Sequence, residues 1–116
     1  IMAVITNTAA KVPGPIGAMN VVTWTAVTTG DTGSPVQNPG QADRSVQVDG
    51  TFGGATCTIQ GSNDGVTYYT LTDQAGTALT FTSAGLRQVL QITRYIRPSV
   101  SAGAGSLNIN LLIVGK

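Results

Sequence analysis

The sequence predicts an all-β protein built as a single-domain antiparallel sandwich of two sheets. Threonine outnumbers even the 15 glycines and valine is plentiful, and both residue types suit a pleated, half-buried surface. Seven or eight short segments alternate apolar and polar residues, the period of a strand with one buried face, and turn residues separate them. With 116 residues, the chain is large enough for one core and one domain.

Residues 1–20 are expected to form an extended N-terminal arm, and residues 21–116 the sandwich domain. Pro13, Gly14, Pro15 and Gly17 interrupt any regular element in the arm, because proline lacks the amide donor and fixes φ. Such an arm either covers the edge of its own sheet or reaches onto a neighbouring subunit. Both possibilities stay open at this point.

The first expected strand covers residues 20–29, with Val22, Trp24 and Ala26 on its inward face. Trp24 is most simply a core residue. Residues 30–43 contain two prolines and three glycines and predict a long turn-rich loop, of a length that is usually functional or mobile.

A second strand is expected over residues 44–52, after which Gly53 and Gly54 mark a bulge or tight turn. Residues 50–71 then predict a hairpin whose turn is Ser-Asn-Asp-Gly at 62–65, because Asn, Asp and Gly tolerate positive φ. In its second arm, adjacent tyrosines must point to opposite faces. One of them is therefore expected to be exposed or at an interface, with ordinary cross-strand packing as the alternative.

Three further segments complete the sandwich. Residues 78–82 are expected to form a strand with Leu79 and Phe81 inward, and residues 86–92 are ambiguous, with irregular or strand structure favoured. Residues 95–100 predict a strand that contains Pro98 and is therefore expected at an edge or a bulge. The cleanest alternation covers residues 107–114. The whole pattern favours a jelly-roll-like sandwich, with an immunoglobulin-like one as the alternative.

The composition excludes most catalytic chemistry. The chain has no histidine and no glutamate, so Ser-His-Asp and Cys-His catalysis, histidine-containing zinc sites and glutamate-based acid–base pairs are ruled out within one chain. Cys57 falls on the apolar face of its strand and is expected to be a buried small hydrophobe. The aspartates fall mostly in turns, without the spacing of a calcium loop. We therefore expect no enzyme activity, no metal and no cofactor.

The charge pattern bears on partners. Charged residues make up only 9% of the chain, so neighbouring copies repel one another weakly, which suits a protein packed into an assembly. A net charge of +1 argues against nucleic acid as a partner. No segment approaches the roughly 20 apolar residues of a membrane span, and no signal peptide is recognised at the start. A small secreted β-domain is the alternative on composition.

Two resemblances meet at the expected hairpin. The run Ile-Gln-Gly-Ser-Asn-Asp-Gly-Val-Thr-Tyr at 59–68, followed by Tyr-Ile-Arg-Pro at 95–98, resembles discoidin-like, galactose-binding-like jelly rolls. With Gly-Thr-Phe-Gly-Gly-Ala-Thr at 50–56 and Arg-Tyr-Ile-Arg-Pro at 94–98, the chain also resembles small head decoration, or cement, proteins of tailed bacteriophages. The second resemblance covers most of the chain and the first only two segments. The short chain, the low charge and the proline-containing arm favour the second.

That resemblance implies a structural virion protein, assembled in the host cytoplasm, that binds the major capsid protein on the outer capsid surface and stabilises the shell. It also implies a homo-oligomer, a trimer or dimer. The alternative is a carbohydrate-binding module of a phage fibre or secreted protein, with Tyr68 or Tyr69 and Arg97 at its site; both roles can coexist if the partner includes a host glycan. The candidate partner contacts are Val12, Pro13 and Pro15 of the arm, Asp31, Pro35 and Pro39 of the loop, and Tyr69, Arg94 and Arg97 of the later strands.

Overall fold

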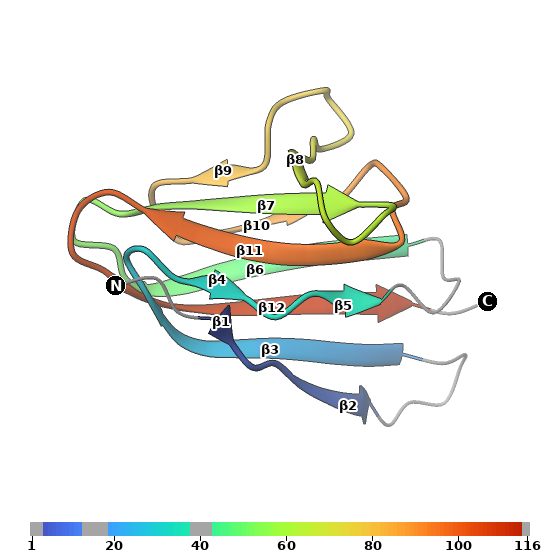
Figure 1. The fold of residues 1–116 in the computed structure, drawn as a ribbon, viewed down its shortest axis with the longest axis horizontal. Helices are drawn as coiled ribbons and strands as arrows, with labels where there is room; N and C mark the ends of the chain where they lie inside the picture. The colour runs from blue at the N-terminus through green and yellow to red at the C-terminus, as the bar shows by residue number, and fades with distance from the viewer. Residues whose placement is uncertain (1–3, 13–18, 38–42, 115–116) are drawn as a thin grey trace.

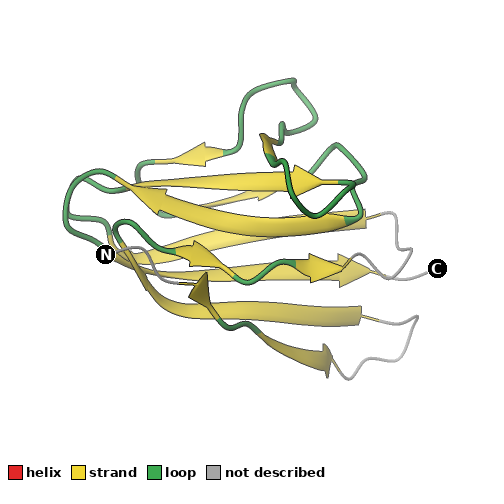
Figure 2. Cartoon of the chain, in the orientation of Figure 1, coloured by secondary structure: helices red, strands yellow, loops and turns green. Residues whose placement is uncertain are grey.

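Two β-sheets pack face to face in the computed structural model, which describes residues 4–12, 19–37 and 43–114. The described residues contain strands, turns and loops but no helix (Figures 1 and 2). A membrane-crossing helix is accordingly absent from this part of the chain. The predicted all-β, two-sheet sandwich is confirmed.

The five-stranded sheet is antiparallel throughout, in the order β10-β6-β12-β3-β2. Its central strand, β12, is the segment with the cleanest alternation in the sequence. Its strands are β2 (Thr8–Val12), β3 (Met19–Thr28), β6 (Asp43–Thr51), β10 (Gly85–Gln88) and β12 (Ser106–Val114).

The seven-stranded sheet has the order β1-β4-β11-β7-β8, with β5 paired to β11 and β9 paired to β7. The short pair β1–β4 is parallel and the other pairs are antiparallel. Its strands are β1 (Val4–Ile5), β4 (Thr32–Gly33), β5 (Val36–Gln37), β7 (Thr56–Ser62), β8 (Tyr69–Thr70), β9 (Thr80–Phe81) and β11 (Tyr95–Ser101).

The pairing pattern identifies the sandwich as a jelly roll. From β3 onward, the first strand pairs with the last, β3 with β12, and the second with the next to last, β4 and β5 with β11. Further inward along the chain, β6 pairs with β10, and β7 with β8 and β9. A chain folded back on itself and then rolled into two sheets gives this order. The jelly-roll-like expectation is therefore confirmed by topology.

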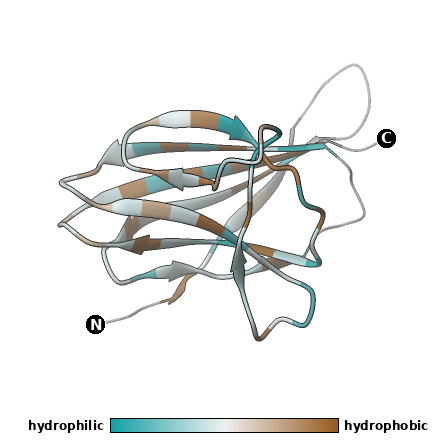
Figure 3. Ribbon diagram, turned by 90° about the horizontal axis from the view of Figure 1, so that it is seen from above, coloured by the Kyte–Doolittle hydropathy of each residue, from teal (hydrophilic) through white to brown (hydrophobic). Residues whose placement is uncertain are grey.

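The core lies between the two sheets, and along most of the longer strands buried apolar residues alternate with outward polar ones (Figure 3). Trp24, Cys57, Leu79 and Phe81 are all buried, as expected. The indole Nε1 of Trp24 donates a hydrogen bond to the carbonyl oxygen of Ser34 at 2.9 Å, which links β3 of one sheet to the β4–β5 connection of the other. The single tryptophan thus contributes both burial and a bond between the layers.

A bulge in β3 changes which residues face the core. The register with β12 shifts between Leu107 and Ile109, and Ala26 has a positive φ of 56°. Ala26 is consequently exposed, its amide donating to Asn108 Oδ1 at 3.1 Å, while Val27 is buried. The expectation that Ala26 points inward was wrong, because the extra residue of a bulge reverses the alternation beyond it.

Pro98 lies in the middle of a sheet and not at an edge, and the register with the neighbouring β4–β5 segment shifts by one residue beside it, as at a bulge. Its strand β11 pairs with β7 on one side and with β4 and β5 on the other. Proline has no amide to donate, and this is tolerated because the strand pairing on the β4/β5 side is interrupted next to Pro98. On that side, Ser99 pairs with Thr32 of β4 and Ile96 pairs with Val36 of β5. The proline thus sits beside a break between two short strands.

Within the ranges described, the residues expected to form an arm and a loop contain short strands. β1 and β2 pair with β4 and β3 of the same chain, so these parts of residues 1–20 cover the edges of their own sheets. β4 and β5 interrupt the loop expected over residues 30–43. The turn at Gly53 and Gly54 leads from one sheet to the other, from β6 to β7.

Candidate functional site

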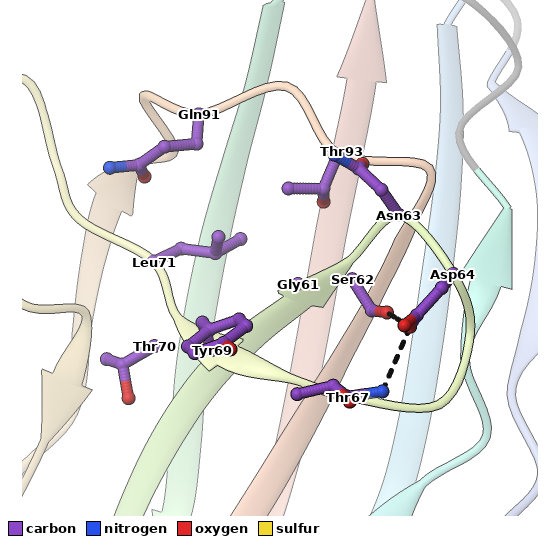
Figure 4. A pocket seen from close by; sticks show the side chains of 10 residues that line it. All are labelled: Gly61, Ser62, Asn63, Asp64, Thr67, Tyr69, Thr70, Leu71, Gln91 and Thr93. Atoms are coloured by element: carbon purple, nitrogen blue, oxygen red, sulfur yellow. Dashed lines mark hydrogen bonds between the residues drawn. The ribbon is translucent and has the colours of Figure 1, made fainter.

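A hollow of about 640 Å³ opens beside β8 at one end of the seven-stranded sheet (Figure 4). One wall is the β7–β8 loop, residues 63–68, and the opposite wall is the β10–β11 connection, residues 89–94. The floor is formed by the end of β7. We call this site the hollow; it is lined by Gly61, Ser62, Asn63, Asp64, Thr67, Tyr69, Thr70, Leu71, Gln91 and Thr93.

Asp64 organises the first wall. Its Oδ1 accepts hydrogen bonds from the amides of Val66 at 2.8 Å and Thr67 at 2.9 Å and from the Ser62 hydroxyl at 2.8 Å. These bonds, those from the two amides first, hold the pKa of the Asp64 carboxyl below its usual value. The predicted turn chemistry of this aspartate is confirmed. The β7–β8 connection is nevertheless wider than the expected four-residue turn, because the first ladder pair is Gly61 with Tyr69.

The loop conformation is expected to depend on pH through this carboxylate. Because the folded-state pKa is lowered, the bonds to Asp64 stabilise the loop above the unfolded value of about 3.9 and are lost as pH falls through the folded pKa. The amide resonances of Val66 and Thr67 should therefore titrate together, with a midpoint below about 3.9. In Asp64→Asn this transition should disappear. A midpoint at or above the usual aspartate value in the unmodified chain would contradict the geometry.

The second wall is tied to the first and to the interior. Asn63 Oδ1 accepts a bond from the Arg94 amide at 2.9 Å, which joins the two loops. The Gln91 side chain accepts from the Thr72 amide and donates to the Thr72 hydroxyl, both at 2.7 Å. Arg44, a buried residue of β6, donates through Nη2 to the Gln91 carbonyl. The wall is thus held from both sides.

Burying the charged guanidinium of Arg44 costs free energy. Burial lowers the pKa of its guanidinium, and within the described part of the chain Nε and Nη1 have no hydrogen-bond partner. No local pattern in the sequence predicts a buried cation at the start of β6. Its one bond reaches the backbone that lines the hollow, so Arg44 supports the hollow wall and does not itself line it.

The two tyrosines point to different surroundings, as their adjacency predicts. Tyr69 is 70% exposed and lines the hollow. Tyr68 is half-buried; the Arg97 guanidinium lies over its ring at 3.8 Å, and burial raises the pKa of its hydroxyl. Arg97 also donates to Gln60 Oε1 at 3.0 Å. Tyr69 is therefore the aromatic side chain of this pair that a partner can reach.

Gly61 allows the floor to be closely packed. A Cβ at this position would lie 2.6 Å from Thr93 Oγ1 and 2.8 Å from Leu71 Cδ2. Thr93 is itself fixed, since its hydroxyl donates to the Tyr95 carbonyl at 2.8 Å. The absent side chain therefore lets β7 approach the opposite wall.

The hollow presents polar groups to a partner. Among the described residues that line it, Asp64 supplies the one carboxylate, and the other polar groups are amides and hydroxyls. Cys57 is buried in the core, where desolvation raises the pKa of its thiol to about 12, so it is not a nucleophile at neutral pH. Within the described residues there is no group of three potential metal-ligating side chains among His, Cys, Asp and Glu.

The remaining expected contacts that the structure describes are not among the residues that line the hollow. Asp31 is buried in the turn after β3, where Oδ2 accepts from the Thr28 amide and hydroxyl at 3.1 and 2.6 Å. Arg94 is exposed beside the Tyr95 ring, and Pro35 is exposed between β4 and β5. The backbone of Val12 pairs with Met19 at the end of β2. Pro13, Pro15 and Pro39 lie outside the described residues.

A second surface is the outer face of the five-stranded sheet. Leu86, 65% exposed, lies in the edge strand β10, and two shallow depressions of about 300 and 270 Å³ follow the strands beside it. The side chains alternate with the buried ones and are almost all uncharged. This outer face comprises Val21, Thr23, Asp43, Ser45, Gln47, Asp49, Leu86, Gln88, Asn108, Asn110 and Leu112.

Comparison with known proteins places the fold. No protein-family model matches the sequence, and no curated protein matches it. Among solved structures, the SPBc2 prophage-derived protein YomS is similar, with a TM-score of 0.67 and 12% identity over 89% of this chain and 100% of that one. The likeness is therefore one of fold, and it extends over the whole length of YomS.

Two further solved structures are less similar. A cupin 2 conserved barrel domain protein from Leptotrichia buccalis has a TM-score of 0.43 and 16% identity, over 93% of this chain and 40% of that one. Peruvianin-I, a cysteine peptidase from Thevetia peruviana latex, has a TM-score of 0.42 and 15% identity, over 84% and 50%. Neither carries an argument about the function of this chain.

Proposed function

We propose that the chain is a structural protein of a phage particle, which binds the major capsid protein on the outer surface of the shell and stabilises it. The observation that carries the proposal is the outer face of the five-stranded sheet. This face combines exposed and half-buried apolar side chains, Leu86, Leu112 and Val21, with amides and hydroxyls, and among the described residues its charged groups are the two carboxylates of β6. Such a surface loses little on desolvation compared with a charged one, which favours a permanent protein contact.

Two further points support this assignment. The jelly roll is shared with a prophage-derived protein over that protein's full length. The chain also has charges on only 9% of its residues, which reduces repulsion between copies crowded on a lattice. As a symmetric trimer or dimer, the protein would repeat weak contacts and attach by avidity.

The proposed attachment surface differs from the arm and loop expected from the sequence. The described parts of those segments, β1, β2, β4 and β5, already pair within the chain. Deleting the first 17 residues would remove β2 and leave the edge of β3 unpaired, so a loss of attachment after that deletion would not separate docking from folding. Point substitutions on exposed side chains avoid this difficulty.

A Leu86→Asp variant is expected to bind capsids about tenfold more weakly than the unmodified chain, because a charge would be buried at the contact. Capsids of the encoding phage that lack this protein are mixed with each variant, and occupancy is measured by co-sedimentation and electron cryomicroscopy. Ile92→Asp is the matched control: Ile92 is 66% exposed, close to the 65% of Leu86, but lies in the β10–β11 connection.

These outcomes test the structural role of the protein and its contact surface separately. Equal binding of Leu86→Asp and the unmodified chain would overturn the sheet face as the contact. Loss of binding in Ile92→Asp alone would move the contact to the end that carries the hollow. Particles without density for the chain on the outer shell would overturn the structural role itself.

A further inference from the structure

We propose that the hollow beside β8 binds a neutral saccharide, a role that goes beyond attachment to a shell. The starting observation is Tyr69, whose ring stays 70% exposed at the rim of a concave, polar surface. Aromatic rings supply a flat apolar face with a polar tip. The C–H face of a sugar ring packs on such a surface while its hydroxyl groups remain free to form hydrogen bonds.

Polar groups on the wall formed by the β7–β8 loop match those hydroxyl groups. The three hydrogen bonds to Asp64 described above all end on Oδ1, so within the described part of the chain Oδ2 keeps its capacity to accept sugar hydroxyls. Asn63 uses Oδ1 for the Arg94 amide and keeps the two donors of its Nδ2. Figure 4 shows both side chains on the wall that faces Gln91 and Leu71.

The charge of the lining selects the class of sugar. Among the described residues, the lining has one carboxylate, that of Asp64, and no Lys or Arg side chain. Because hydrogen bonds lower the pKa of this carboxyl, it is ionised at neutral pH and repels acidic sugars. An organic cation would suit the carboxylate and the ring, but it would leave the Asn63 donors without acceptors. Neutral hydroxyl groups, which donate and accept, satisfy both walls.

The hollow is also formed in advance. Asp64 fixes one loop, the Asn63–Arg94 bond joins it to the other, and the bond from Arg44 holds Gln91 from the interior. Little conformational entropy is then lost on binding, which compensates for a site with a single aromatic platform. A volume of about 640 Å³ lies within the range of small-molecule sites and accommodates a mono- or disaccharide.

Titration of the full-length, ¹⁵N-labelled chain with N-acetylglucosamine, galactose, glucose and lactose tests the proposal. At least one sugar should produce saturable shifts in the amide resonances of residues 61–71 and 91–93. Tyr69→Ala should weaken the affinity by about tenfold or more, and Tyr69→Phe should retain it within about threefold, because the ring is kept. Val66→Ala is the matched control on the same loop, since Val66 is 81% exposed and does not line the hollow.

Three results would overturn the proposal: no saturable shift with any neutral sugar at millimolar concentration, equal affinity of Tyr69→Ala and the unmodified chain, or tighter binding of glucuronate or spermidine than of every neutral sugar. The measurement is independent of capsid attachment. Leu86→Asp should bind the sugar normally, and Tyr69→Ala should still decorate capsids, so failure of one role leaves the other standing.

Discussion

A Gly33→Ala variant is expected to lose about 3 kcal/mol of its free energy of unfolding. A Cβ at Gly33 would lie 2.5 Å from Pro98 Cδ and 2.5 Å from Trp24 Nε1. Neither neighbour can yield cheaply: the proline ring is rigid and fixed in the middle of β11, and the indole is held by its bond to the Ser34 carbonyl. The added methyl group must push β4 away from the core and break that bond.

Gly85→Ala is the matched control for this substitution. A Cβ at Gly85 meets the Phe81 ring at 3.5 Å, an ordinary van der Waals contact, and neither glycine has a positive φ. The control should therefore change the free energy of unfolding by less than about 1 kcal/mol. Urea unfolding followed by circular dichroism measures both variants. Similar values for the two would show that β4 does not pack against Pro98 and Trp24 as described.

A Leu111→Ala variant is expected to lose about 2–5 kcal/mol of the free energy of unfolding. Leu111 is fully buried at the centre of β12, between β6 and β3, and truncation leaves a cavity that neighbouring strands cannot close. Against a typical total of about 5–15 kcal/mol, this is a large fraction. The adjacent Leu112 points to the outer face of the sheet, so the same leucine-to-alanine change there serves as the control.

Leu112→Ala should cost less than about 1.5 kcal/mol, because Leu112 is only half-buried and its removal leaves no internal cavity. The comparison by urea unfolding needs an unchanged dependence on denaturant, so that both variants report stability alone. If Leu112→Ala were the more damaging of the two, the inward and outward faces of β12 would be reversed.

The sequence alone predicts the buried residues of a strand correctly where apolar and polar residues alternate without interruption. In β12, Leu107, Ile109, Leu111 and Ile113 are all buried, as their alternation with asparagine predicts. In β3 the same reasoning failed after Trp24, because alanine and valine both fit an inward position and nothing local marks the bulge at Ala26. The central position of Pro98 could not be predicted, because its tolerance depends on β4 and β5, which lie more than 60 residues earlier in the chain.

The hollow was predictable only in part. An exposed tyrosine and the Asp64 turn follow from local pattern, and both were expected. Gln91 comes from the segment whose structure the sequence left ambiguous, and Thr93 follows just after that segment; the long-range fold brings both opposite the tyrosine. The burial of Arg44 could not be predicted from the sequence, because an arginine at the start of a strand is usually exposed.

The position of the last two strands sets the timing of folding. β11 is central in one sheet and β12 in the other, so each sheet receives its middle strand from the final part of the described chain. On the ribosome, β3, β6 and β7 emerge without their main partners and wait until residues 95–114 have been synthesised. Folding of this jelly roll is therefore delayed until these two strands have been synthesised, and a polypeptide truncated before residue 95 exposes unpaired, apolar strands that favour aggregation.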